Sequence, residues 1–360
     1  MDYEAFDSAD YHVVPVDHHG LELDEYLCLL FPGVTKGALR RMIRGGRILV
    51  DGEAVNPSHR VRAEQVLVID LDAALEVEGP AAPAAPLGVL HEDESVLIVD
   101  KPPGVAVEPE RWDRGAPTMA GALLARARAD AEAGRTEWRP RLCHRLDKDT
   151  TGCLAVARDL ETERRLRQAF EEGRIEKRYL ALVEGEFDGG AEEWTTIDRA
   201  IAKSDRRAGQ MRVSHAGKPS ITDVRVAERY RGYTLVECRP RTGRTHQIRV
   251  HLADAGHPLA VDPLYGRRDA LLLSEIKRGY KPKRGQKERP LMDRLTLHAA
   301  SLVLPTPEAG ESSAPDPAEL DFTGTGGASS DGRWIAARSP LPADLERITK
   351  QLRKVRAYRT

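Results

Sequence analysis

The sequence predicts an α+β protein of two domains, and three observations carry this prediction. The chain has 360 residues, more than one compact domain usually holds. Residues 71–86 are rich in proline and alanine, a composition typical of interdomain linkers. Short helical patterns precede this stretch, and longer apolar strands follow it. We therefore expect a weakly ordered lead-in at residues 1–20, a small domain at 21–70 and a larger domain at 87–360.

The small domain has the pattern of two helices followed by two strands. Leu23, Tyr26, Leu27 and Leu30 recur at helical spacing. A second helix is expected from Thr35, a residue type that favours the N-cap, to the stop at Gly45-Gly46. Strands are expected at 47–50 and 65–69, with a turn at Asp51-Gly52.

Charge is segregated along the chain. The formal net charge is only -2, which would ordinarily argue against a nucleic-acid partner. The distribution matters more than the sum, however, and cations accumulate in the small domain. These cations are Lys36, Arg40, Arg41, Arg44, Arg47, Arg60 and Arg62.

Cysteine spacing and hydropathy exclude several classes of protein. The four cysteines are scattered and form no CxxC pair, so neither a disulfide scaffold nor a zinc ribbon is indicated. No apolar run approaches the roughly 20 residues of a membrane span. The acidic N-terminal stretch does not resemble a signal peptide. We expect a cytoplasmic protein with no membrane partner.

The larger domain alternates strands, helices and polar loops. Residues 267–290 are rich in Lys, Arg and Gly and predict an exposed loop, and residues 305–332 have the composition of a disordered insertion. Strands are expected at 95–100, 153–157, 175–184 and 233–239, and helices at 160–172, 245–255 and 342–354.

A polar cluster at residues 144–152 directly precedes the apolar strand at 153–157. Loops held by a rigid strand often carry catalytic residues. Asp147 lies between Arg145 and Lys148, whose charges should keep its carboxylate ionised, as a nucleophile requires. The same residues would also fit a capped turn with a surface ion pair, and physical reasoning alone leaves both readings open.

A second cluster of cations and histidines lies at residues 241–251. On a helix, His246 and Arg249 share one side, so Arg249 could point into a site while Ile248 packs behind it. Arginine at such a place suits phosphate or carboxylate recognition. His246 and His251 are five residues apart, which does not place two metal ligands on one helical face. We expect no metal site here.

Tyr179 stands among basic residues at the start of a strand, in a chain with only 5% aromatic residues. RNA-binding enzymes commonly stack a base on such a ring. A half-buried strand tyrosine is the structural alternative.

Together these segments resemble the RluA-type pseudouridine synthases. HRLDKDTTG resembles the catalytic loop of that family, EKRYLALVEG its tyrosine strand and RTGRTHQIRVHLADAGHPLAVDPLYG its arginine motif. SVLIVDKPPGVAV and RLTLHAASLVL resemble its opening segment and a late strand, in the same order. Residues 21–70 resemble the S4-like RNA-binding domain. The resemblance implies a mixed, mostly antiparallel sheet flanked by helices, behind a small α/β RNA-binding domain.

The resemblance also implies site residues. Asp147 matches the catalytic aspartate, Tyr179 the tyrosine against the target base, and Arg249 the arginine that pairs with the aspartate. Arg145 matches the residue that fills the gap left by the flipped nucleotide. Further substrate-binding candidates are His144, Arg244, His246 and Ile248, and the RNA-binding candidates of the small domain are Lys36, Arg40, Arg41, Arg44 and Arg47.

We therefore expect an isomerase that acts on structured RNA, with large-subunit ribosomal RNA favoured over transfer RNA. It should need no cofactor, because isomerisation adds and removes no atoms. We expect it to work as a monomer. Asp147 would attack either the ribose or the base, and Tyr179 would hold the freed uracil and help remove the proton from its carbon. The base would first be flipped out of its stack.

Two alternatives remain at this point. An RNA glycoside hydrolase would need a second carboxylate across the bond, and Asp149 is poorly placed because it lies on the same loop. A catalytically inactive RNA-binding or ribosome-assembly factor would have no reason to keep Asp147, Tyr179 and Arg249 together.

Overall fold

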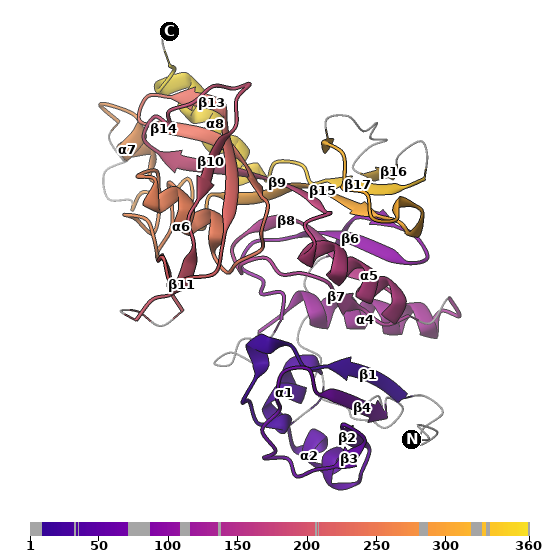
Figure 1. Cartoon of the computed structure of the whole chain (residues 1–360). Helices are drawn as coiled ribbons and strands as arrows, with labels where there is room; N and C mark the ends of the chain where they lie inside the picture. The colour runs from indigo at the N-terminus through magenta and orange to yellow at the C-terminus, as the bar shows by residue number, and fades with distance from the viewer. Residues whose placement is uncertain are drawn as a thin grey trace. The chain divides into compact units, whose positions relative to one another are not determined.

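The computed structural model describes most of the chain as two compact units (Figure 1). One unit comprises Met1–Ala85 with Ala106–Arg126, and the other comprises Pro86–Val105 with Ala127–Thr360. The described residues are 9–31, 34, 36–70, 87–108, 116–135, 138–205, 207, 209–280, 287–317, 326–328 and 332–358. Among them, no helix combines the length and the apolar character that a membrane span needs.

The smaller unit is a four-stranded antiparallel sheet with two helices. The strand order is β1-β4-β2-β3. Side chains of α1, α2, β2 and β4 share one apolar core that includes Leu27, Ile43, Ile48 and Ile69. The elements are β1 (Ala9–Val13), α1 (Leu23–Leu30), α2 (Lys36–Arg44), β2 (Ile48–Val50), β3 (Glu53–Ala54) and β4 (Val66–Asp70).

Both expected helices and both expected strands of the smaller unit are present, whereas the prediction for its beginning was partly wrong. Residues 9–13 were expected in a weakly ordered lead-in, but they form β1. This strand pairs with the outer edge of β4 from Ala9↔Asp70 to Val13↔Val66 and so covers backbone groups that β4 would otherwise leave open. The expected N-cap, Thr35, and the expected linker at 71–86 lie outside the described residues.

The larger unit is built on a mixed sheet of eleven strands, and this confirms the predicted fold class. Its main order is β10-β13-β14-β9-β15-β8-β6-β5; in addition, β17 pairs with β15 and β16, and β7 pairs with β8. Among the described residues, the strand pairs of this sheet are antiparallel except β15 with β8. The strands are β5 (Gly88–Glu92), β6 (Val96–Lys101), β7 (Arg141–Leu142), β8 (Thr151–Ala157), β9 (Glu176–Glu184), β10 (Thr195–Asp198), β13 (Ile221–Tyr230), β14 (Tyr233–Pro240), β15 (Leu297–Pro305), β16 (Gly326–Ala328) and β17 (Trp334–Arg338), and a separate hairpin consists of β11 (Ile201–Lys203) and β12 (Met211–Val213).

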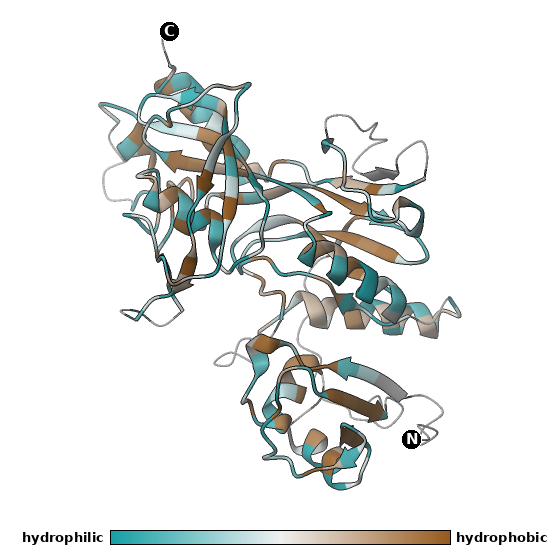
Figure 2. Cartoon of the chain, in the orientation of Figure 1, coloured by the Kyte–Doolittle hydropathy of each residue, from teal (hydrophilic) through white to brown (hydrophobic). Residues whose placement is uncertain are grey.

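Helices cover different parts of this sheet. Leu166 and Ala169 of α5 pack on β6, β8, β15 and β17. Ile248 and Leu252 of α6 pack on β9, β13 and β14. Figure 2 shows the apolar character of β6 and the polar outer surface of α5. The helices are α4 (Met119–Glu132), which spans the boundary between the units, α5 (Leu160–Glu171), α6 (Gln247–Asp254), α7 (Leu273–Ile276) and α8 (Ala343–Val355).

Two segments expected to be loops are more ordered than their composition suggested. In the first, Leu271 and Ile276 are buried, and residues 273–276 form the short helix α7. In the second, β15 extends to Pro305, a 3-10 helix follows at Pro307–Ala309, and Asp316 pairs with the buried Arg178 at 2.6 Å. Burial of Leu271 and Ile276 and the ion pair of Asp316 with Arg178 thus stabilise segments whose composition is mostly polar. Residues 281–286, 318–325 and 329–331 lie outside the described residues.

The start of β15 connects two segments that are distant in the sequence. Ala299 pairs with Gly152 of β8 on one side and with Tyr179 of β9 on the other. Gly152 has φ +111°, and a Cβ placed on it would lie 2.1 Å from the Ala299 carbonyl oxygen. Only glycine permits both this conformation and this approach. Gly152 therefore holds the polar loop at 144–151 beside Tyr179.

We predict that Gly152→Ala destabilises the larger unit by about 4 kcal/mol or more, because the backbones of β8 and β15 must separate. Gly256→Ala is the matched control: Gly256 also has positive φ, but no atom lies within 4 Å of the added methyl group. Only the conformational cost of about 1–2 kcal/mol should then appear. Urea unfolding of both variants tests this, and equal losses would contradict it.

Candidate functional site

The polar loop before β8 forms a turn that the surrounding structure holds from several sides. Thr150 N–H donates to the Asp147 carbonyl at 3.0 Å and closes the turn. Arg294 Nη1 donates a hydrogen bond to the Asp149 carbonyl at 3.3 Å. The Nη2 and Nε atoms of the same guanidinium donate to the carboxylate of Asp344 in α8 at 2.6 and 2.7 Å. These contacts fix the backbone of the turn that carries Asp147.

Lys101 holds the same turn from within the protein. Its side chain is fully buried, and Nζ donates to the carbonyls of Pro102, Val105 and Lys148 at 2.7–2.8 Å. Burial lowers the pKa of Lys101 to about 7, while the nearby carboxylates of Asp149 and Asp147 oppose the shift. Sequence reasoning did not select this residue. The available signal was a lysine that ends an apolar strand immediately before Pro-Pro-Gly.

Arg249 joins the turn to α6. It is only 4% exposed, and Nη1 donates to Asp147 Oδ2 at 2.8 Å. Its Nε and Nη2 donate hydrogen bonds to Asp262 Oδ2 and Oδ1 at 2.8 and 2.9 Å. The two carboxylates raise the pKa of the guanidinium and outweigh the effect of burial, so it stays charged. As expected from helical spacing, Arg249 points towards Asp147 while Ile248 enters the core behind it.

Asp262 is the site residue that sequence reasoning missed most clearly. Its side chain is completely buried, and Oδ1 also accepts from the backbone N–H groups of Leu264 and Tyr265 at 2.9 and 3.1 Å. Asp147 keeps 27% of its side chain exposed. The two carboxylates therefore differ in role: Asp262 fixes the Arg249 guanidinium, and Asp147 faces the solvent. A carboxylate directly after the apolar run 259–261 was the signal in the sequence.

Tyr179 lies beside the turn, since its strand pairs with Ala299, which also pairs with Gly152. Burial and the charge of Asp147 raise the pKa of the Tyr179 hydroxyl. The hydroxyl therefore keeps its proton at neutral pH. Of the three predicted catalytic residues, Asp147 and Arg249 are in direct contact. Tyr179 is close enough to Asp147 for the carboxylate charge to raise the pKa of its hydroxyl.

His246 and Tyr265 lie close to Asp147 and Arg249. His246 Nε2 is 3.9 Å from Asp147 Oδ1, and Nδ1 is 2.8 Å from the Tyr265 hydroxyl. The Tyr265 ring also lies 5.0 Å from the Arg249 guanidinium, at cation–π distance. Burial lowers the pKa of His246, and Arg249 and Arg145 act in the same direction while Asp147 and Asp262 oppose them.

The remaining substrate-binding candidates lie in different surroundings. Arg145 and Arg244 are exposed. His144 Nε2 accepts a hydrogen bond from Ala155 N–H at 2.9 Å, its ring lies 4.8 Å from Phe170, and burial lowers its pKa to about 3. The structure thus gives His144 a packing role, and its role towards substrate stays a prediction.

The predicted RNA-binding cations of the smaller unit are not equally available. Arg41 and Arg44 are exposed on α2, opposite its buried residues. Arg40 Nε pairs with the buried Asp24 at 2.6 Å, and Arg47 pairs with Asp70. The side chain of Lys36 lies outside the described residues. Arg41 and Arg44 are therefore the described candidates best placed to meet a phosphate.

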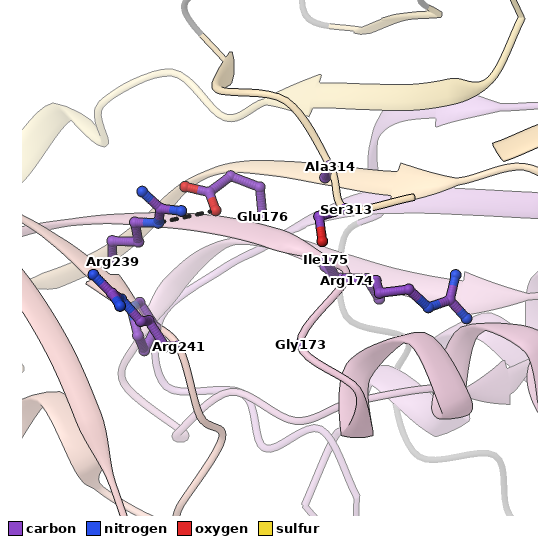
Figure 3. A pocket seen from close by; sticks show the side chains of 9 residues that line it. Gly173, Arg174, Ile175, Glu176, Arg239, Arg241, Ser313 and Ala314 are labelled. Carbon is purple, nitrogen blue, oxygen red and sulfur yellow. Dashed lines mark ion pairs between the residues drawn. The ribbon is translucent and has the colours of Figure 1, made fainter. Parts of the chain in front are cut away.

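A cavity of the larger unit is lined by residues that include Glu176, Arg239 and Arg241 (Figure 3). Its arginines have carboxylate partners: Arg239 pairs with Glu176 at 3.2 Å, and Arg241 pairs with Asp223 at 2.6 Å. Alternation along β9 puts Glu176 on the face opposite to Tyr179. The cavity and the Asp147 site therefore occupy opposite faces of the sheet.

Comparisons with known proteins place the whole chain in a family. Residues 95–254 match the family model described as RNA pseudouridylate synthase. The chain is 34% identical over 350 residues to the ribosomal large subunit pseudouridine synthase D of Xanthomonas campestris, across 95% of this chain and 92% of that protein. The chain belongs to the RNA pseudouridylate synthase family. Members of this family are isomerases, so the predicted family and enzyme class are confirmed.

Three further comparisons concern a second relative, the fold and the small domain. The ribosomal large subunit pseudouridine synthase C of Salmonella typhimurium is 35% identical over 308 residues, across 83% of this chain and 89% of that protein. The structure of human RNA pseudouridylate synthase domain containing 4 shares the fold, with a TM-score of 0.51 at 23% identity across 74% of this chain and 93% of that chain. Residues 23–67 match the S4 domain model, as the small domain's pattern suggested.

We predict that Asp262→Ala lowers the stability of the larger unit by about 3–5 kcal/mol, because it leaves the buried Arg249 with one partner fewer. Pseudouridine formation by the folded protein should also fall about 100-fold, because Arg249 and Asp147 lose their fixed positions. Chemical unfolding and single-turnover assays measure the two effects.

Asp223→Ala is the control. Asp223 is also buried and pairs with an arginine, Arg241, but lies outside the site. It should lose stability and keep its turnover. If both variants turned over normally once folded, Asp262 would have no role at the site.

Proposed function

We propose that this pseudouridine synthase isomerises specific uridines of large-subunit ribosomal RNA, with Asp147 as the nucleophile. The observation that carries the proposal is the buried Arg249, which presents a solvent-facing Asp147 beside Tyr179. The relatives named as acting on the ribosomal large subunit support the choice of RNA, because the chain matches them over most of its length.

The chemistry fits these groups. The bond from ribose C1′ to N1 breaks, the uracil rotates, and C5 bonds to C1′; atoms and electrons are conserved, so the reaction needs no cofactor. The carboxylate of Asp147 would trap either the electron-poor ribose carbon or the base, as carboxylates do in glycosidases. Arg249 would favour the ionised carboxylate. Tyr179 would stack against the uracil and limit how far it moves while it rotates.

The target must leave the RNA stack before Asp147 can reach it, and flipping costs a few kcal/mol. Arg145 is exposed two residues before Asp147, so it is suited to fill the space that the nucleotide leaves. Arg41 and Arg44 of the smaller unit would bind flanking phosphates, and Arg244 would add a contact on the larger unit. We propose that a single copy of the chain suffices.

Mapping pseudouridine at single-nucleotide resolution tests the proposal. Unmodified large-subunit ribosomal RNA, small-subunit ribosomal RNA and transfer RNA are incubated with the full chain and with Asp147→Asn. We expect new pseudouridines in large-subunit RNA with the natural chain and none with the variant, which is isosteric but cannot act as a nucleophile. Free uracil would indicate a hydrolase, and modification only in transfer RNA would contradict the substrate.

We also predict that Arg41→Ala combined with Arg44→Ala weakens binding to this RNA and lowers the slope of log affinity against log salt by about 1–2, as expected when two phosphate contacts are lost. Lys350→Ala, an exposed cation on α8 that pairs with Glu346, is the control and should leave the slope unchanged. Filter binding across a salt series measures both. An unchanged slope in the double variant would remove α2 from the RNA interface.

A further inference from the structure

Breaking the bond between the ribose and the base puts negative charge on the uracil. Whichever centre Asp147 attacks, the electron pair of the C1′–N1 bond goes to N1, and resonance shares it with the carbonyl oxygens of the ring. A hydrogen-bond donor that faces one of these oxygens would lower the barrier to this step. The need for such a donor rests on the proposed function.

The buried cations of the site are already engaged with protein groups. Arg249 donates to Asp147 Oδ2 and to both carboxylate oxygens of Asp262. Lys101 Nζ donates to three backbone carbonyls. Asp147 Oδ1, in contrast, accepts no hydrogen bond among the described residues, so it is the oxygen of the nucleophile that is free to react. A donor to the substrate should therefore lie beside Oδ1.

His246 places a ring nitrogen beside this oxygen. Its Nε2 lies 3.9 Å from Asp147 Oδ1, which is too far for a hydrogen bond, and 16% of its side chain is exposed. This separation allows a substrate to contact both groups at once. Burial lowers the pKa of His246, so the ring is neutral at pH 7 and one of its two nitrogens holds a hydrogen.

Tyr265 determines which nitrogen holds that hydrogen. Its oxygen lies 2.8 Å from His246 Nδ1 and accepts a hydrogen bond from Met211 N–H, also at 2.8 Å. These two groups are its hydrogen-bond partners among the described residues, so the hydroxyl hydrogen is donated to Nδ1. Nδ1 is therefore the acceptor, and Nε2 carries a hydrogen that faces the site.

The backbone at His246 supports a functional role. His246 has φ 55° and is the one non-glycine residue with positive φ among the described residues of the larger unit. Residues with a Cβ seldom adopt this conformation. The residue occupies the N-cap of α6, yet its side chain makes no capping hydrogen bond. Helix capping therefore does not account for the histidine, and strained backbone often lies at functional sites.

We propose that His246 is a catalytic residue whose Nε2–H donates a hydrogen bond to O2 of the target uracil. O2 is the base oxygen nearest to C1′, where the bond breaks, because its carbon is bonded directly to N1. The step breaks the C1′–N1 bond and leaves the electron pair on the uracil, and the hydrogen bond moves no proton. Tyr265 is a positioning residue, because it fixes the hydrogen on Nε2.

The experiment measures single-turnover rates on ribosomal RNA fragments with uridine, 2-thiouridine or 4-thiouridine at the position that the natural chain modifies. Sulfur accepts a hydrogen bond more weakly than oxygen, so 2-thiouridine weakens a contact to O2, and 4-thiouridine is the control substrate. His246→Gly removes the donor, and glycine permits the positive φ. We expect its rate on uridine to fall about 100-fold, as when one donor to a developing oxyanion is removed.

The ratio of the uridine rate to the 2-thiouridine rate is the deciding measurement. It should be about 10-fold larger in the natural chain than in His246→Gly, because the variant has no contact that sulfur can weaken. The corresponding ratio for 4-thiouridine should be the same in both proteins. Because each ratio compares two substrates of one protein, a loss of folded protein does not change it.

Two further variants separate this role from a structural one. Tyr265→Phe should lower the 2-thiouridine ratio to a value between those of the natural chain and His246→Gly, because the tautomer with hydrogen on Nδ1 can then form. His257→Ala is the control: this histidine contacts the Glu184 carbonyl, outside the site, and the variant should keep the natural rate and ratio.

Three results would overturn the inference: a natural rate in His246→Gly, equal 2-thiouridine ratios in both proteins, or a difference between the proteins that appears with 4-thiouridine and not with 2-thiouridine. If the natural chain formed no pseudouridine in large-subunit ribosomal RNA, the proposed function itself would fail, which is a separate outcome.

Discussion

The buried guanidinium of Arg249 is the interaction on which the site depends. Taking a charged arginine out of water costs several kcal/mol, and only close partners offset this cost. Here three N–H donors meet two carboxylates at 2.8–2.9 Å. Asp262 receives the two-pronged contact and is fully buried, whereas Asp147 receives a single hydrogen bond and stays partly exposed. The same arginine therefore binds one carboxylate that is buried and one that stays accessible to solvent.

The fold brings these groups together through the centre of the sheet. The short parallel pairing of β8 with β15 puts the Asp147 turn next to Ala299, and Ala299 in turn pairs with Tyr179. Lys101 and Arg294 then hold the backbone of the turn at Lys148 and Asp149. Helix α6 supplies His246 and Arg249, with its apolar side in the core. Residues from several separate segments thus meet in one place, and the backbone of the turn is fixed independently of the side chains of Asp147 and Arg249.

Much of this could be predicted from the sequence because the signals were local. Helical spacing predicted α1 and α6, the helix expected at 160–172 forms as α5, and the motif around Asp147 indicated the family. Partners formed by tertiary folding could not be predicted in this way. The sequence does not show that Asp262 meets Arg249, or that Lys101 turns inward, because these contacts form only when separate segments of the chain pack together. The strand β1 was missed for the same reason: it exists because β4 has an open edge.

The central claim is that Arg249, held by Asp262, presents Asp147 to a nucleotide that has left the RNA stack. A crystal structure of the chain with a ribosomal RNA fragment that carries 5-fluorouridine at the modified position tests it most directly, since fluorine at C5 cannot leave as a proton. We expect the target nucleotide to be flipped out, an oxygen of Asp147 in contact with or bonded to it, and Arg249 still hydrogen-bonded to Asp262. A target that stays stacked, or an Asp147 side chain turned away from the nucleotide with Arg249 released from Asp262, would contradict the account.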